Sequence, residues 1–320
     1  MRTIVQKWGL LAIGILIGAA YGVVTRLVFG ETATMASITY LFLIPAVLGV
    51  IPLVFASNDQ IRSYRNIIFI PWLTILTFFV TAMLTGLEEV LCLLVLAAPF
   101  FVLATVAALI VRLVMIHKSR NKLMAFAALP FLIAPVEELV KSPSEIYTVE
   151  SEIVIAASPD VIWGNIVEVP EIGDDEYTPG IFNRLGIPRP LYAEVTAKEK
   201  GAIRFGNFQG GLRFVETLTE FEPNRHVAFT TIVDPHTIGP RVFDQHVLTG
   251  NYFNFVDAAY RLADAGDGRV RLTLATNYRL TSKVNFYGKF WGDIILEDFQ
   301  DRLLAVIKKR CETAAVPAGP

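Results

Sequence analysis

Apolar segments separated by short polar loops fill the first part of the chain, residues 1–141. The first four cover residues 8–29, 38–56, 67–84 and 90–111. Each approaches the ~20 residues that an α-helix needs to cross the ~30 Å hydrocarbon core of a bilayer. A cleavable signal peptide is the alternative for the first segment, but its length and the spans directly after it favour a retained anchor. The pattern predicts an all-α membrane bundle of four or five spans.

The charged residues between these segments alternate in sign from loop to loop. Basic residues precede the first segment, separate the second from the third and follow the fourth: Arg2, Lys7, Arg62, Arg65, His117, Lys118, Arg120 and Lys122. The two loops between them are acidic, with Glu31, Glu88 and Glu89. Because basic loops mark the cytoplasmic side of a membrane protein, the sequence predicts a cytoplasmic N-terminus.

A fifth apolar segment, residues 123–136, leaves two topologies open. It contains Pro130 and Pro135 and is 14 residues long, a length more typical of a re-entrant or interfacial piece than of a full span. Glu137 and Glu138 follow it, however, and the other predicted external loops are also acidic. A fifth crossing makes the remaining domain external, and without it that domain is cytoplasmic.

Small residues recur on one face of the first predicted helix, at Gly14, Gly18 and Gly22. Such a repeat lets a second helix approach closely. The sequence leaves open whether that helix belongs to the same bundle or to a second copy of the chain. Within the apolar segments no ionisable residue lies at mid-span, which argues against an ion pathway, a transporter or a pump.

Residues 147–312 have the composition of a soluble domain, and turn residues divide them into short elements. Alternating apolar and polar positions predict strands at 148–156, 191–197, 203–208, 212–221, 227–233, 252–262 and 270–280. The triplet Ser158-Pro159-Asp160 has the residues of a helix start, and a long amphipathic helix over 284–311 follows the last strand. The pattern predicts an α+β domain in which a curved antiparallel sheet packs around the long helix.

One segment of this domain is similar to a known superfamily. Residues 153–163 read IVIAASPDVIW, a strand ending in alanine followed by the helix start and the pair Ile162-Trp163, and residues 291–310 look like that superfamily's closing helix. Over residues 147–312 the chain therefore resembles the START-like, or SRPBCC, superfamily of polyketide cyclases and dehydrases and lipid-transfer domains. The resemblance implies a helix-grip fold with an apolar tunnel between sheet and long helix. The membrane half is not part of that superfamily's usual pattern.

Composition and charge narrow the possible functions. The chain is 53% hydrophobic and 18% charged, with a mean hydropathy of +0.51 and a net charge of -2, which gives no case for nucleic acid as a partner. Cys92 and Cys311 fall in different halves and form no disulfide framework. No phosphate-binding, hydrolase or zinc motif occurs, and the spacing of His226, His236 and His246 fits no metal site, so the sequence predicts neither a metal nor a cofactor.

Several residues of the second half are candidates for lining a ligand site. Glu216 lies in register with Leu212, Phe214 and Leu218, so if that face is the inner one its carboxyl has a raised pKa and anchors a ligand or donates a proton. We expect four further polar residues to face inward: Asn254, Tyr260, Thr276 and Tyr278. Gly288 and Gly292 begin the long helix, where they either leave room for a ligand at the tunnel mouth or let the helix pack closely on a strand.

These features favour a membrane-tethered module that binds a hydrophobic small molecule such as a lipid, an isoprenoid or a polyketide-like compound. The bilayer itself is the other expected partner, and no nucleic acid is. Two alternatives remain open: an enzyme of the cyclase or dehydrase kind that acts on a similar ligand, and a non-catalytic interaction or sensory domain with a filled core.

Overall fold

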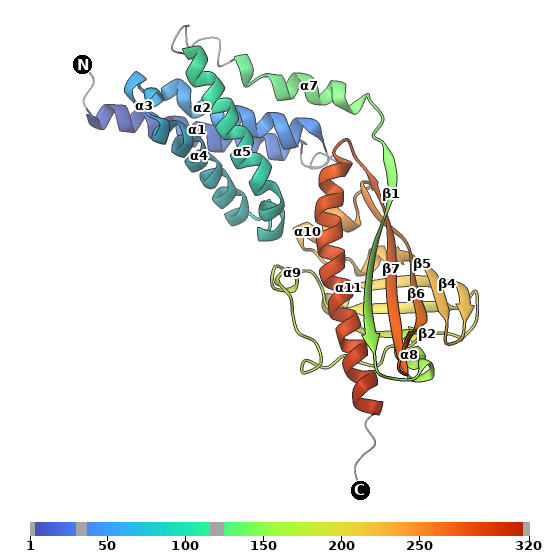
Figure 1. Ribbon diagram of the computed structural model, residues 1–320. Helices are drawn as coiled ribbons and strands as arrows, with labels where there is room; N and C mark the ends of the chain where they lie inside the picture. Colours follow the sequence, from blue (N-terminus) through green and yellow to red (C-terminus); the bar gives the residue numbers. More distant parts are fainter. Residues whose placement is uncertain (1–3, 30–36, 116–124, 316–320) are drawn as a thin grey trace. The chain divides into compact units, whose positions relative to one another are not determined.

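The computed structural model describes residues 4–29, 37–115 and 125–315. The chain divides into two compact units (Figure 1). The first, called the helical unit here, comprises Met1–Pro143 with Ser282–Val284, and the second, called the sheet unit, comprises Ser144–Thr281 with Asn285–Pro320.

Helices, most of them apolar, make up the helical unit. They are α1 (Ile4–Phe29), a π-helical turn η2 (Thr39–Leu43) that leads into α2 (Ile44–Phe55), α3 (Asn58–Arg62), α4 (Tyr64–Leu84), α5 (Val90–Met115) and α7 (Leu129–Glu138). Among the described residues, three stretches are long and apolar enough to cross a membrane, namely Val5–Phe29, Tyr64–Leu84 and Val90–Leu113, whereas the apolar helix Thr39–Phe55 is shorter. Three of the predicted membrane-span candidates are therefore present, at the first, third and fourth predicted segments, and the number of crossings stays a prediction.

The glycines of α1 are packing positions inside this bundle. A Cβ added at Gly18 would lie 2.6 Å from Thr74 Cγ2, and one at Gly22 would lie 2.7 Å from Phe78 Cδ2. Because residues 18 and 22 meet residues 74 and 78 in the same order, α1 and α4 run parallel. Gly14 likewise approaches Phe55 at the end of α2. The glycine face serves packing within one chain, and association of two chains through it stays a prediction.

Charged residues gather at the two ends of the bundle. At the end where α1 and α4 begin, Lys7 Nζ lies 2.8 Å from Asp59 Oδ2, and the Arg112 guanidinium lies 3.4 Å from the centre of the Tyr64 ring. At the opposite end, Arg26 and Glu88 form an ion pair whose side chains are at most 8% exposed. Since the chain alternates between the ends from α1 to α5, Lys7, Arg62 and Arg65 lie at one end and Glu88 at the other. The other charged loop residues of the prediction lie outside the described residues: Arg2, Glu31, His117, Lys118, Arg120 and Lys122.

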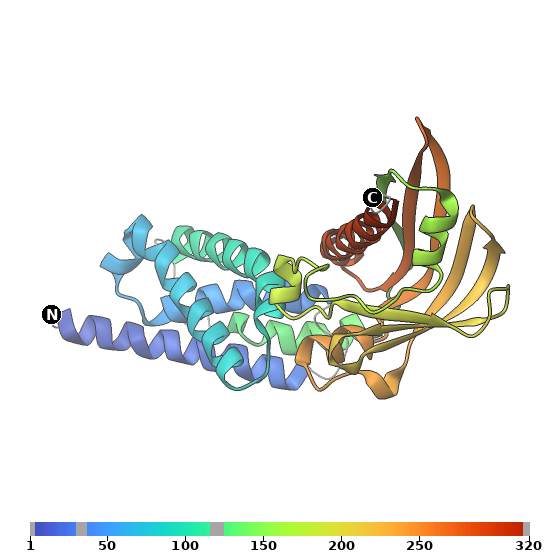
Figure 2. The same ribbon diagram turned by 90° about the horizontal axis from the view of Figure 1, so that it is seen from below.

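The sheet unit contains one antiparallel sheet of seven strands in the order β1-β7-β6-β5-β4-β3-β2. The strands are β1 (Ser144–Ile155), β2 (Pro190–Val195), β3 (Ile203–Phe208), β4 (Arg213–Glu222), β5 (His226–Val233), β6 (Phe253–Gly266) and β7 (Arg269–Thr281). The helices are α8 (Pro159–Ile166), α9 (Ile181–Arg184), α10 (Val242–Leu248) and α11 (Asn285–Ala315). Figure 2 shows the sheet curling around α11, so the expected helix-grip architecture is confirmed.

Alternation along β7 shows why the sheet closes on this helix. Its even-numbered apolar residues are buried, among them Leu272 and Leu274, while Arg271 and Arg279 are exposed. Leu304 and Ile307 of α11 meet this face in the main core of the unit. All seven predicted strands and the long helix are present within a few residues of their expected bounds. Helix α10 was not predicted, because the sequence between residues 235 and 251 has no clear period.

Candidate ligand-binding site

The concave face of the sheet is apolar, with a small number of polar side chains buried in it. Its core includes Ile155, Leu218, Phe229 and Leu272, and α11 covers them with Leu303 and four neighbours on the same side of the helix: Leu304, Val306, Ile307 and Cys311. Polar groups in such surroundings need partners. We therefore compare the hydrogen-bond partners of these polar side chains. An atom without a partner is a candidate contact for a ligand.

Glu216 lies on this inner face, one of the two orientations that the register left open, and it is 6% exposed. The sequence did not predict its partner. Arg204 on β3 lies directly opposite Glu216 on β4, and the two side chains form a buried ion pair. Burial raises the pKa of the Glu216 carboxyl, and the charge of Arg204 opposes that shift. The carboxylate is thus already occupied by a fixed cation of the protein.

Arg204 is held by more than this carboxylate. Its Nε donates to the carbonyl oxygen of Val167 at 3.0 Å, and Nη2 donates to that of Ile166 at 3.4 Å. Both carbonyls lie at the C-terminal end of α8, where the helix dipole favours a cation. Tyr260 is 2% exposed beside this pair, and burial raises the pKa of its hydroxyl to about 12. The cluster joins β3, β4 and α8 in one network.

Tyr278 and Thr276 face α11, as predicted, and both find partners on it. Tyr278 is fully buried, and its hydroxyl donates to Asp293 Oδ1 at 2.6 Å. Burial and this carboxylate raise the pKa of the Tyr278 hydroxyl. The Thr276 hydroxyl accepts a hydrogen bond of 2.9 Å from Nε2 of Gln300, a helix residue that was not among the predicted site residues.

Gln300 has a buried polar atom without a hydrogen-bond partner among the described residues. It is 1% exposed, and its Nε2 also donates to the carbonyl oxygen of Val149 at 3.2 Å. Its Oε1 is buried and has no hydrogen-bond partner within the part of the chain that the structure describes. Two donor contacts therefore fix the amide, and its carbonyl oxygen lies between α11 and the sheet without a hydrogen bond.

The expectation that Asn254 faces inward is wrong. Asn254 is exposed and pairs across the sheet with Arg279, which is also exposed. The cause is a β-bulge between Phe255 and Asp257. A bulge inserts one extra residue into a strand, so the alternation that buries Tyr260 on β6 is shifted by one before it reaches Asn254.

Gly288 and Gly292 are sites where α11 packs closely on β7. A Cβ at Gly288 would lie 3.0 Å from Leu280 Cδ1, and one at Gly292 would lie 3.1 Å from the Tyr278 hydroxyl oxygen. The structure thus supports close packing for both glycines. It gives no support to a ligand mouth at these two positions.

We expect the substitution Gly292→Leu to lower the free energy of unfolding by about 1–3 kcal/mol, because the larger side chain overpacks the contact with Tyr278. Gly164 in α8 is the matched control, since no atom lies within 4 Å of an added Cβ there. Gly164→Leu should leave stability unchanged or raise it by up to ~1 kcal/mol through helix propensity. Thermal unfolding of both variants measures the difference, and equal melting temperatures would contradict the packing assignment.

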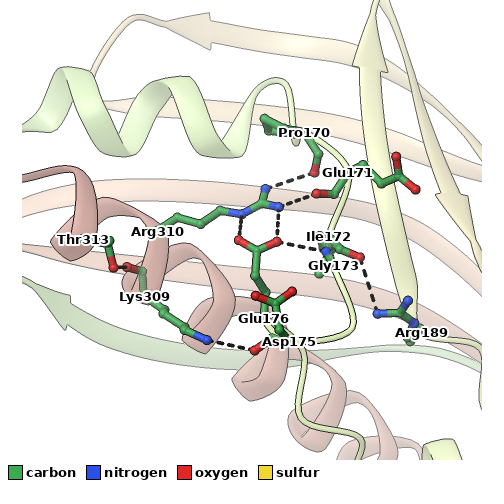
Figure 3. A network of polar contacts seen from close by, with 10 residues as sticks. All are labelled: Pro170, Glu171, Ile172, Gly173, Asp175, Glu176, Arg189, Lys309, Arg310 and Thr313. Carbon is green, nitrogen blue, oxygen red and sulfur yellow. Dashed lines mark hydrogen bonds and ion pairs between the residues drawn. The ribbon is translucent and has the colours of Figure 1, made fainter.

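A polar network attaches the loop before β2 to the last turns of α11 (Figure 3). Arg310 lies 2.7 Å from both carboxylate oxygens of Glu176 and donates to the carbonyl oxygens of Pro170 and Glu171 at 3.0 and 2.6 Å. Lys309 Nζ donates to the Asp175 carbonyl oxygen at 2.9 Å. Ile172 and Tyr177 of the same loop are buried in the main core. The network thus closes the core beside this end of the helix.

Solved structures match the sheet-unit part of this chain at low sequence identity and low TM-score. The aromatase/cyclase Zhui from a Streptomyces species is 12% identical, covers 55% of this chain and 100% of its own, and has a TM-score of 0.34. Norcoclaurine synthase from Thalictrum flavum is 15% identical, covers 53% of this chain and 94% of its own, and has a TM-score of 0.33. A protein from Nitrosospira multiformis is 16% identical, with 53% and 99% covered and a TM-score of 0.34.

No protein-family model matches the sequence, and no curated protein matches it. Identities and TM-scores as low as those of the solved structures support no transfer of function. The assignment of a helix-grip fold therefore rests on the strand order of this sheet and on the helix that it encloses.

Proposed function

We propose that the sheet unit binds a hydrophobic molecule between its concave face and α11, and that the helical unit tethers it to a membrane. The compound classes that suit such a site are lipids, isoprenoids and polyketide-like molecules. The observation that carries the proposal is the carbonyl oxygen of Gln300, which is buried between α11 and the sheet without a hydrogen-bond partner among the described residues.

Leaving a buried amide carbonyl without a hydrogen bond costs ~1–3 kcal/mol. Gln300 cannot turn away from the interior without losing its contacts to Val149 and Thr276. A ligand hydroxyl that donates to Oε1 would remove this cost, while the rest of the ligand contacts apolar side chains. The preferred ligand is therefore apolar with one hydrogen-bond donor.

The substitution Gln300→Leu tests this proposal in the full chain purified in detergent. The probes are farnesol, an isoprenoid alcohol, and farnesene, the matching hydrocarbon. We expect wild-type protein to bind farnesol more tightly than farnesene. Gln300→Leu should lose about tenfold in affinity for farnesol, the effect of one buried hydrogen bond, and should keep its affinity for farnesene. The exposed Gln209 provides the control Gln209→Leu. Failure of the wild-type protein to bind either probe would refute the proposal.

An enzyme of the cyclase or dehydrase kind requires a titratable group that exchanges protons with the ligand. Glu216 is the carboxyl best placed for that role, and it is paired with Arg204. The Tyr278 hydroxyl is paired with Asp293. Because each of these two groups is already paired with a neighbouring side chain, binding is the function that we propose and no reaction is included.

We further propose that the chain crosses the membrane once more before the sheet unit begins, which makes that unit external. Near the end of α5, Arg112 Nη2 donates to the Arg62 carbonyl oxygen at 2.8 Å, at the basic end of the bundle. Later in the chain, Glu137 accepts hydrogen bonds from the backbone N–H groups of Ile38 and Thr39, beyond the opposite end of α1. Between them, the Tyr21 hydroxyl donates to the Ala127 carbonyl oxygen at 2.8 Å. These contacts support passage from one end of the bundle to the other between Arg112 and Glu137.

Reporter fusions test this topology. A reporter joined after Lys118 should behave as cytoplasmic, and one joined after Pro320 should behave as external. The reason is that basic residues at the first end mark the cytoplasmic side. Cytoplasmic behaviour of both fusions would mean an even number of crossings and would reject this part of the proposal.

A further inference from the structure

A groove runs along the helical unit between α1 and α4. It has a volume of about 510 Å³ and is lined by apolar side chains together with Arg65 and Asn66 at one end: Trp8, Leu11, Ala12, Ile15, Phe69, Ile70 and Leu73. Three of the lining side chains are more than half exposed, at 55% for Trp8, 58% for Phe69 and 52% for Leu73. The groove therefore opens on the surface of two helices that are each long and apolar enough to span a bilayer.

Polar and apolar lining residues are separated along its length. Arg65 and Asn66 begin α4, level with Trp8 near the start of α1, and the lining is wholly apolar from there to Ile15 and Leu73. Because the two helices run parallel, this polar end is the basic end of the bundle. Eight residues of helix extend ~12 Å. In the membrane orientation proposed above, the apolar part would reach into the hydrocarbon layer and Arg65 would lie at the headgroup level.

Some of the basic residues at this end already have a partner for their charge, and others do not. Lys7 is paired with Asp59, and Arg112 is stacked on Tyr64. Within the described residues, the side chains of Arg65 and Asn66 make no ion pair and no hydrogen bond. An unpaired guanidinium presents a planar fork that matches two phosphate oxygens, and a basic pocket between membrane helices on the cytoplasmic side is suited to an anionic lipid headgroup.

We propose that this groove is a binding site for one anionic glycerophospholipid. The phosphate is held by Arg65 with Asn66 as a second donor, and one acyl chain lies along the groove between α1 and α4. Trp8, whose ring suits the membrane interface, borders the entry of that chain. This site lies in the helical unit and is independent of the ligand proposed for the sheet unit.

The fluorescence of Trp8 provides a test of this proposal, because Trp8 lines the groove. The full chain is placed in phosphatidylcholine nanodiscs that contain a minor fraction of lipid with brominated acyl chains, which quench tryptophan fluorescence on contact. The brominated lipid is either phosphatidylglycerol or phosphatidylcholine, and Trp8→Phe isolates the contribution of Trp8 from those of the other tryptophans. We expect quenching of Trp8 to favour the anionic lipid by about fivefold, the effect of one arginine near a lipid surface.

Two pairs of variants distinguish specific lipid binding in the groove from non-specific electrostatic attraction of anionic lipid. Arg65→Gln should abolish the preference for the anionic lipid, while Arg62→Gln, which removes an exposed charge at the same end that does not line the groove, should retain it. Ala12→Leu should exclude the acyl chain and reduce quenching, while Ala20→Leu, an exposed position on the same helix, should not. Equal quenching by the two lipids, or equal losses in Arg65→Gln and Arg62→Gln, would overturn the proposal.

Discussion

Substituting Arg204 with methionine should lower the free energy of unfolding around β3 and β4 by about 3–5 kcal/mol, the cost of leaving a buried charge unpaired. Glu216 would remain 6% exposed with its counter-charge removed. The two carbonyl oxygens at the end of α8 would also lose their donor. Hydrogen exchange of the β3 and β4 amides in the full chain measures this loss locally, because exchange reports the free energy of opening.

The double variant Arg204→Met/Glu216→Leu is the matched comparison. With both charges replaced by apolar side chains of similar size, no charge is left buried, and stability should recover to near the wild-type value. A single variant as stable as the wild type would show that Glu216 is not a buried anion in the folded protein. A double variant no better than the single one would show that the arginine is needed for its contacts to α8.

Alternation and turn residues were sufficient to predict the elements of the sheet unit. Every turn between consecutive predicted strands contains Gly, Asn or Asp, and the strict alternation of 270–280 gave the buried side of β7 directly. In the helical unit, length and hydropathy predicted the long helices. The shorter helix Thr39–Phe55 shows the limit of that method, because hydropathy does not show where a π-helical turn or a loop begins.

The candidate site was harder to predict because its polar residues depend on register. The prediction that Asn254 faces inward was wrong because of a β-bulge, and a periodic sequence pattern does not show where a bulge lies. Arg204 was missed although a signal was present: the turn at Gly210-Gly211 sets the β3–β4 register, and that register places residue 204 opposite residue 216. Gln300 lies within a helix face that was assigned from its apolar members alone. Its partners come from β1 and β7, more than twenty residues away in each case.

Removing Arg310 should also cause a large loss of stability, because this side chain is the centre of a polar network. Arg310→Met would remove the ion pair with Glu176 and the contacts to two loop carbonyls. Hydrogen bonds to charged groups contribute ~1.5–3 kcal/mol each when buried, and both side chains here are partly shielded, at 14% and 25% exposed. We expect a loss of about 2–3 kcal/mol in local stability, measured as faster hydrogen exchange in residues 170–177. Arg269→Met is the control, because Arg269 is 50% exposed in a surface pair with Asp267, and it should change stability by less than ~1 kcal/mol.

The same pair predicts a dependence on pH with a definite sign. Hydrogen bonding to Arg310 is the main cause that lowers the pKa of the Glu176 carboxyl from 4.5 to about 2 in the folded protein. A carboxyl with a depressed folded pKa contributes stability that is fully present above its unfolded pKa and is lost as the pH falls through the folded value. The wild-type loop should therefore lose protection between about pH 4.5 and pH 2, and in Glu176→Gln this part of the dependence should disappear. If wild type and Glu176→Gln showed the same acid profile, the pair would not be what holds the loop against α11.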